Sequence, residues 1–132
     1  MKPIAHATLT SRSGYTQAID VRGHKLAADE PVASGGADAG PTPYELVLAG
    51  LGACTAITLR MYAQRKGWEL GEVRVNLTIL KEEHAAQIER DVRFSAPLTD
   101  EQRARLAEIA EKTPVTKTIR AGAPIRTRFP QE

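Results

Sequence analysis

Cysteine is almost absent from this chain: Cys54 is the only one in 132 residues. A single cysteine excludes an internal disulfide, so we expect an intracellular, reduced and cytoplasmic protein. Aromatic residues make up only 5% of the chain, which leaves aliphatic side chains and alanine to fill the interior. The N-terminal segment MKPIAHATLTSRSG has no apolar stretch long enough for a signal peptide.

The sequence also lacks long apolar runs and runs of like charge. The longest uncharged apolar stretch, Leu46 to Leu59, is 14 residues, whereas a bilayer span needs about 20. The 18 basic and 16 acidic residues are interspersed and give a net charge of +2. We therefore expect neither a membrane nor a nucleic acid as partner. His6, His24 and His84 lie far apart without ligand spacing, so we predict no metal and no cofactor.

What is present predicts one α+β domain over residues 1–132. Short alternating strands and turns fill the first 28 residues, and a Gly- and Pro-rich loop follows up to Pro43. Alternation predicts strands within residues 71–80 and 87–94. Thr99 and Thr113 as N-caps predict helices within residues 98–112 and 113–119, and residues 123–129 suggest a closing strand. This order indicates helices laid on antiparallel sheets.

A long helix dominates the middle of the chain. Thr42 as N-cap, Pro43 at the first helical position and Glu45 three residues after the cap predict its start, and Gly67 predicts its end. Its residues from Leu46 to Leu59 are apolar or small on every face, so it must be surrounded. We expect a homodimer that buries two such helices against each other.

The stretch DEPVASGGADAGPTPYELVLAGLGACTAITLRMYAQRKGW resembles the signature region of the OsmC-like superfamily, which includes the organic hydroperoxide resistance proteins. LTDEQRARLAEIAEKTPVTKTI resembles the second signature of that family, in which a cysteine usually precedes the PV dipeptide. The resemblance implies an OsmC-like fold and an intertwined homodimer with sites at the subunit interface. It also implies thiol peroxidase chemistry, in which one cysteine attacks the hydroperoxide and a second resolves the sulfenic acid.

The resemblance assigns roles to four positions. Cys54 falls where the attacking cysteine belongs, and Thr113 stands where the resolving cysteine belongs. Arg12 occupies a place comparable to that of the activating arginine, with Arg22 as a rival. Glu45 lies one residue beyond the position of the family glutamate. Cys54, Arg12 and Glu45 are thus the candidate catalytic residues.

Two functions follow, and the residues alone leave both open. The first is a one-cysteine reductase in oxidative stress defence, in which Cys54 attacks an organic hydroperoxide and an external thiol reduces the product. The second is a non-catalytic module that binds a small apolar or electrophilic ligand at the dimer interface. A dimeric scaffold is a third possibility. Cys54 by itself is also compatible with inert core packing, because free cysteine is among the most buried residue types.

Overall fold

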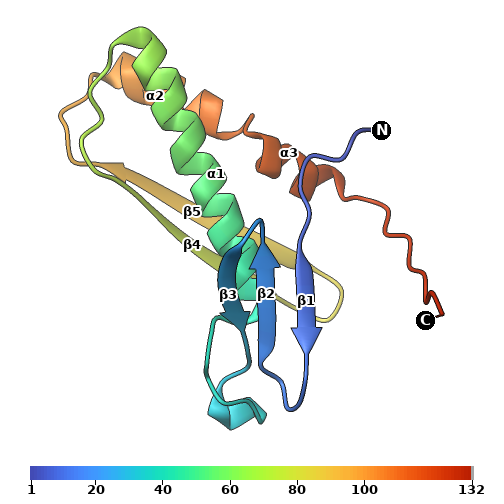
Figure 1. Cartoon of the computed structure of the whole chain (residues 1–132). Coiled ribbons are helices and arrows are strands. Elements are labelled where there is room, and N and C mark those ends of the chain that lie inside the picture. Colours follow the sequence, from blue (N-terminus) through green and yellow to red (C-terminus); the bar gives the residue numbers. More distant parts are fainter. Residues whose placement is uncertain (132) are drawn as a thin grey trace. The chain divides into compact units, whose positions relative to one another are not determined.

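The structure is a computed structural model that describes residues 1–131. The chain forms two compact units, an N-terminal unit of Met1–Ala49 and a C-terminal unit that begins at Gly50. The division falls within the long helix α1, Pro43–Lys66 (Figure 1). Each unit is described by itself below.

Three antiparallel strands make up the sheet of the N-terminal unit. They are β1 (Thr8–Ser11), β2 (Gln17–Val21) and β3 (His24–Ala28), in the order β1-β2-β3. The turn between β2 and β3 consists of Arg22 and Gly23, which have φ angles of 52° and 85°. Two successive residues with a left-handed backbone conformation match the right-handed twist of a tight hairpin. This turn therefore fixes the register that pairs Val21 with His24.

The loop after β3 is organised around Asp29, which is buried. Its carboxylate accepts hydrogen bonds from the Thr16 hydroxyl at 2.6 Å and from the backbone N–H of Glu30 and Ala39. A short 3-10 helix, η1 (Val32–Ser34), lies within the loop. A Cβ on Gly36 would lie 2.0 Å from the Glu30 carbonyl oxygen, so only glycine fits there. The hydrogen bonds to Asp29 and the close backbone approach at Gly36 therefore stabilise the conformation of this loop.

Helix α1 begins and ends as the sequence predicts. The Thr42 N–H donates to the Glu45 carboxylate at 2.8 Å, and the Glu45 N–H donates to the Thr42 hydroxyl at 3.2 Å. This reciprocal pair is a capping box. Gly67, at a φ angle of 71°, follows the last helical residue, as is typical of a helix C-terminus.

By length and composition alone, α1 could also cross a membrane. Its most apolar 18-residue window has a mean hydropathy of 1.5, and 28% of that window is buried within the chain. The core helix of a soluble protein meets the same criterion. The expectation that no membrane is a partner therefore stays a prediction.

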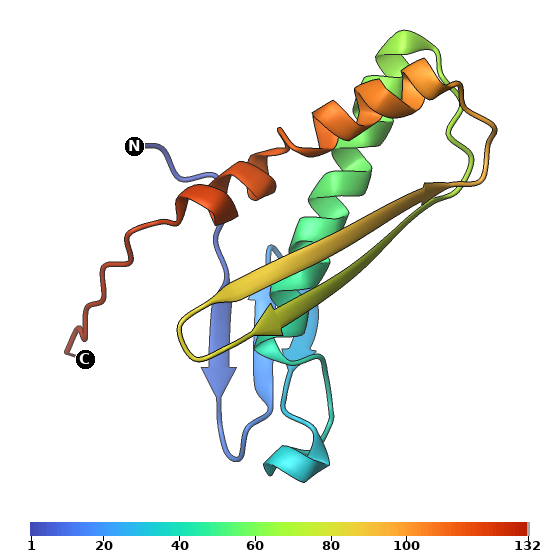
Figure 2. The same cartoon turned by 180° about the vertical axis from the view of Figure 1, so that it is seen from behind.

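The C-terminal unit contains a long hairpin and two further helices. Strands β4 (Val73–Lys81) and β5 (Ala86–Phe94) pair antiparallel, and α2 (Asp100–Ala110) and α3 (Pro114–Ala121) follow. A buried cluster joins α1 to α2: Leu59, Ala63, Leu70, Leu106 and Ala110. Seen from behind, α2 runs beside the C-terminal part of α1 and above the end of β5 (Figure 2). Both helices thus cover one face of the hairpin.

The closing strand predicted within residues 123–129 is wrong for this chain taken alone. After α3, residues 122–131 form no regular element, and Ile125 and Phe129 are almost fully exposed. The alternation of these residues suits a strand, but a strand forms only where its backbone groups meet a partner edge. No other segment among residues 1–131 pairs with this one.

Candidate functional site

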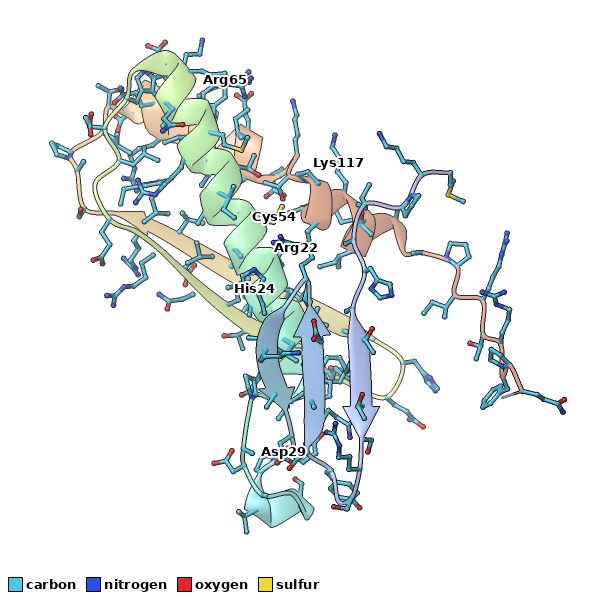
Figure 3. All side chains as sticks on the ribbon, in the orientation of Figure 1. Arg22, His24, Asp29, Cys54, Arg65 and Lys117 are labelled. Carbon is cyan, nitrogen blue, oxygen red and sulfur yellow. The ribbon has the colours of Figure 1, made fainter. Side chains whose placement is uncertain are left out.

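Cys54 lies on α1 in the C-terminal unit and is half-buried (Figure 3). Its sulfur is 4.0 Å from the hydroxyl oxygen of Thr58, one helical turn further along. At this distance a thiol and a hydroxyl form at most a weak hydrogen bond. The thiol is thus neither sealed in the core nor fully solvated.

The face of α1 that carries Cys54 is apolar and uncovered. Ile57 and Met61 lie three and seven residues after Cys54, on the same side of the helix, and each is 58% exposed. The opposite side of α1 packs inward through Leu51, Thr55 and Leu59, all of which are buried. Within the C-terminal unit, as far as residue 131, this part of α1 is therefore covered on one side, and an apolar molecule could reach the thiol from the other.

Arg90 holds together the elements next to the Cys54 segment. One of its terminal nitrogens donates to the hydroxyl oxygens of Thr55 and Thr116, at 2.9 Å each. The other donates to the Ala110 carbonyl oxygen at 3.1 Å and lies 3.8 Å from the Glu111 carboxylate. Only 12% of the Arg90 side chain is exposed. These contacts tie β5 to α1, to the end of α2 and to α3.

Sequence reasoning missed Arg90, although the strand pattern contained the signal. Arg90 has the same parity in β5 as Ile88, Val92 and Phe94, which the sequence places on the inward face. Alternation therefore points this arginine at the helices, where a buried charge needs partners. The threonine hydroxyls that satisfy it come from other elements, and no local pattern identifies them.

Thr113 is completely buried and acts as the N-cap of α3. Its hydroxyl oxygen accepts from the Thr116 N–H at 3.4 Å and lies 2.6 Å from the Thr116 hydroxyl. The capping role predicted from TPV is thus confirmed. A hydroxyl group therefore occupies the position where the family resemblance expects a second thiol.

The candidate arginines belong to the N-terminal unit, whereas Cys54 belongs to the other unit. Arg12 follows the last residue of β1 and is exposed, ahead of a turn that contains Gly14 at a φ angle of 62°. Arg22 is exposed in the β2–β3 turn. Contact between either guanidinium and the Cys54 thiol stays a prediction.

Glu45 is placed in the first turn of α1, where its carboxylate accepts the hydrogen bond from the Thr42 N–H. Nine residues separate it from Cys54, so the two side chains leave a straight helix on opposite sides. The structure thus shows Glu45 as a capping residue, and its catalytic role stays a prediction. Among residues 1–131, no three side chains of His, Cys, Asp or Glu gather into a group that could hold a metal.

Comparison with known sequences and structures bears on this arrangement. The sequence profile of a family described as OsmC-like protein matches residues 35–128, which include Cys54, Arg90 and Thr113. A search of curated proteins found no match.

Solved structures share the fold over nearly the whole chain. An OsmC-like protein from Mycoplasma pneumoniae is 14% identical with a TM-score of 0.74, covering 91% of this chain and 89% of its own. An OsmC organic hydroperoxide resistance protein from Legionella pneumophila is 20% identical with a TM-score of 0.64, covering 90% and 92%. The organic hydroperoxide resistance protein OhrB of Bacillus subtilis is 24% identical with a TM-score of 0.65, covering 89% and 90%. The α+β architecture with antiparallel sheets and a long helix is therefore the OsmC-like fold.

Proposed function

Because the chain belongs to the OsmC-like protein family, we propose that it is a redox protein of peroxide defence that reduces an organic hydroperoxide with Cys54. The observation that carries the proposal is the placement of the only cysteine. Cys54 is half-buried on an apolar, uncovered face of α1, beside exposed Ile57 and Met61. This environment suits a lipophilic peroxide. Relatives of the same fold from Legionella pneumophila and Bacillus subtilis are named for organic hydroperoxide resistance.

The proposed reaction begins with attack of the Cys54 thiolate on the terminal oxygen of the hydroperoxide ROOH. An S–O bond forms, the O–O bond breaks, and the alkoxide leaves and takes up a proton to become the alcohol ROH. The sulfur loses two electrons and becomes a sulfenic acid, while the peroxide is reduced. Because a free thiol is mostly protonated at neutral pH, a nearby cation must favour the thiolate. Arg12 is our candidate for that cation, and Arg22 is the alternative.

The second half of the reaction requires an external thiol. Cys54 has no second cysteine to condense with, and Thr113 offers only a hydroxyl. One small thiol would condense with the sulfenic acid, releasing water and leaving a mixed disulfide. A second thiol would then release Cys54 as the thiol and form an external disulfide. Such chemistry fits a reduced compartment, and we place the protein in the cytoplasm.

Turnover of cumene hydroperoxide with dithiothreitol tests this proposal. The wild-type protein should consume the peroxide and produce 2-phenyl-2-propanol in equal amounts, and Cys54→Ser should fall to the uncatalysed rate. Met61→Leu is the control, because Met61 lies on the same face and its own oxidation would consume peroxide without turnover. Equal rates for wild type and Cys54→Ser would refute catalysis by this thiol.

A second function, a non-catalytic binding module, is favoured by one specific observation. Thr113 is fully buried, caps α3 and bonds to Thr116. Where the family resemblance expects a resolving thiol, this chain therefore has a hydroxyl group with a structural role. The Glu45 carboxylate is likewise used for helix capping. On this alternative, the apolar face beside Cys54 holds a small apolar or electrophilic ligand. Native mass spectrometry of the purified protein would then show a bound molecule, in a protein that turns over no peroxide.

We also propose that the working form is a homodimer. The uncovered face of α1 exposes Ile57 and Met61. Burial of apolar side chains of that size against a partner would lower the free energy of the complex. The exposed alternating segment that contains Ile125 and Phe129 pairs with no strand among residues 1–131 and could find a partner edge on a second copy. A dimer would enclose the face that carries Cys54.

A further inference from the structure

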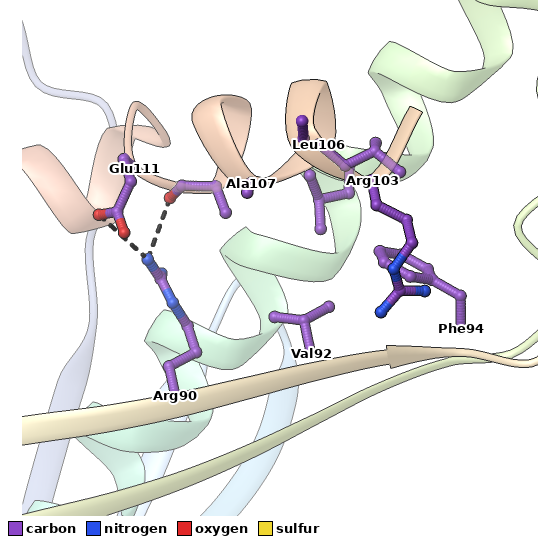
Figure 4. Close-up of a pocket in the computed structure, with 10 residues that line it drawn as sticks. Arg90, Val92, Phe94, Arg103, Leu106, Ala107 and Glu111 are labelled. Atoms are coloured by element: carbon purple, nitrogen blue, oxygen red, sulfur yellow. Dashed lines mark hydrogen bonds and ion pairs between the residues drawn. The ribbon is translucent and has the colours of Figure 1, made fainter. Parts of the chain in front are cut away.

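A hollow lies in the C-terminal unit, between β5 and α2, and Cys54 does not line it. Its volume is about 440 Å³, within the range of small-molecule sites. Val92, Phe94 and Ala107 contribute apolar surface between the strand and the helix. The close-up shows Arg90 reaching from β5 toward Glu111 at one end and Arg103 descending from α2 beside Phe94 at the other (Figure 4). An apolar floor therefore lies between two cationic groups.

The two arginines differ in what their charges meet. Arg90 donates to Thr55, Thr116 and Ala110, and Glu111 lies 3.8 Å from it. Arg103 is exposed, and within residues 1–131 no hydrogen bond or ion pair engages its guanidinium. Its five donors are therefore available to a ligand.

Among residues 1–131, Glu111 is the acidic residue that lines the hollow, and it does not cancel this charge. The Glu111 carboxylate forms a close ion pair with Arg120 as well as facing Arg90. It is thus shared between two cations, and the hollow keeps an excess of positive charge on the Arg103 side. Arg103 lies at one end of the apolar part of the hollow. It suits the carboxylate of an amphipathic anion, because a guanidinium group binds a carboxylate through two parallel hydrogen bonds.

We propose that this hollow is a binding site for a small monocarboxylate with a hydrocarbon tail. The carboxylate pairs with Arg103, and the tail lies along Val92, Phe94 and Ala107. The site goes beyond the proposed peroxide chemistry, because it uses none of the groups assigned to that reaction. Loss of the Cys54 thiol would therefore leave it intact.

Calorimetric titration of the full chain with octanoate tests the site, with octan-1-ol as the neutral probe. Octanoate should bind saturably, with one molecule per chain, and about tenfold or more tightly than octan-1-ol. Arg103→Gln should weaken octanoate binding by about the same factor and leave octan-1-ol unchanged. The matched control is Arg93→Gln, an exposed arginine of β5 with the opposite parity, which should bind octanoate like the wild type. Cys54→Ser should bind octanoate unchanged, which separates this site from the peroxide proposal.

Three results would overturn the inference. They are the absence of saturable octanoate binding, equal affinity for octanoate and octan-1-ol, and an Arg103→Gln variant that keeps wild-type affinity. If a second copy of the chain fills the hollow, octanoate will not bind and Arg103→Gln will change the mass measured by light scattering. That result would also overturn the proposal.

Discussion

Thr113 shows how one side chain changes what the neighbouring chemistry requires. Its hydroxyl group caps α3 and bonds to Thr116, which accepts a hydrogen bond from Arg90. Arg90 in turn donates to Thr55, the residue after Cys54. A series of hydrogen bonds thus connects Thr113 to the segment of α1 that carries the thiol.

We predict that Thr113→Cys restores a two-cysteine reaction at a modest cost in stability. The new thiol should condense with the Cys54 sulfenic acid, and the oxidised chain should lose the mass of two hydrogen atoms. Loss of the threonine cap should lower the free energy of unfolding by about 1 kcal/mol. Intact mass after one equivalent of cumene hydroperoxide, with and without a reductant, measures the first effect. A persistent sulfenic acid with no disulfide would contradict the prediction.

Asp29 supports a prediction about pH. The hydrogen bond from Thr16, with further bonds from backbone N–H groups, holds the pKa of the Asp29 carboxyl below its ordinary value of 3.8. A carboxyl whose pKa is lowered on folding stabilises the folded state above its unfolded pKa, and this stabilisation is lost as pH falls through the folded pKa. Asp29→Asn should therefore be less stable than the wild type at neutral pH, and the difference should shrink below about pH 4.

Urea unfolding of both proteins at several pH values measures this difference. Asp38→Asn is the control, because Asp38 is exposed in the same loop and has a positive φ of 54° that asparagine also adopts. A difference between wild type and Asp29→Asn that does not vary with pH would show that the carboxylate charge is not the stabilising feature.

At the scale of elements, local signals were sufficient for the helices but not for every strand. The caps at Thr42, Thr99 and Thr113 are encoded within four residues of sequence, and each is confirmed. The segment within residues 123–129 alternates like a strand, but its partner edge is not encoded locally. Arg90 illustrates the same limit, because parity gives its direction while its threonine partners come from α1 and α3. For the candidate site, the sequence predicts Cys54 as the reacting residue, which stays a prediction, and reasoning from the sequence missed the Arg90 network.

Arg90→Leu tests whether this network holds the elements together. The substitution removes the donor to Thr55, Thr116 and the Ala110 carbonyl group, and all three residues are buried. A hydrogen bond from a charged group contributes about 1.5–3 kcal/mol, so we expect a loss of about 2–3 kcal/mol in the free energy of unfolding. Arg93→Leu, on the exposed side of β5, should change it by less than about 0.5 kcal/mol. Denaturant unfolding compares the two, and equal losses would contradict the account.

At the scale of the whole molecule, the main feature is the apolar surface of α1, part of which stays exposed in the described chain. The sequence predicts a helix that is apolar on every side, and the structure buries Leu51, Thr55 and Leu59 while leaving Ile57 and Met61 exposed. The family match over residues 35–128 fixes the fold. A second copy of the chain is the partner that we propose for the exposed face.

Met61→Glu should therefore weaken self-association. A charge placed in an apolar interface loses its hydration without gaining a partner, and we expect the dissociation constant of the dimer to rise by at least about tenfold. Gln64→Glu, at an exposed polar position of the same helix, is the matched control. Size-exclusion chromatography with light scattering measures both. A wild-type protein that is monomeric at every concentration would contradict the homodimer.

The central claim, that Cys54 reacts with organic hydroperoxides, is tested most directly by trapping its oxidised form. Reduced protein is mixed with one equivalent of cumene hydroperoxide in the presence of dimedone, and its intact mass is recorded. Dimedone reacts with sulfenic acid, so oxidation of methionine does not contribute to the adduct. The account predicts one dimedone adduct per chain in the wild type and none in Cys54→Ser. A wild-type chain that remains unmodified, with its thiol still reduced, would contradict it.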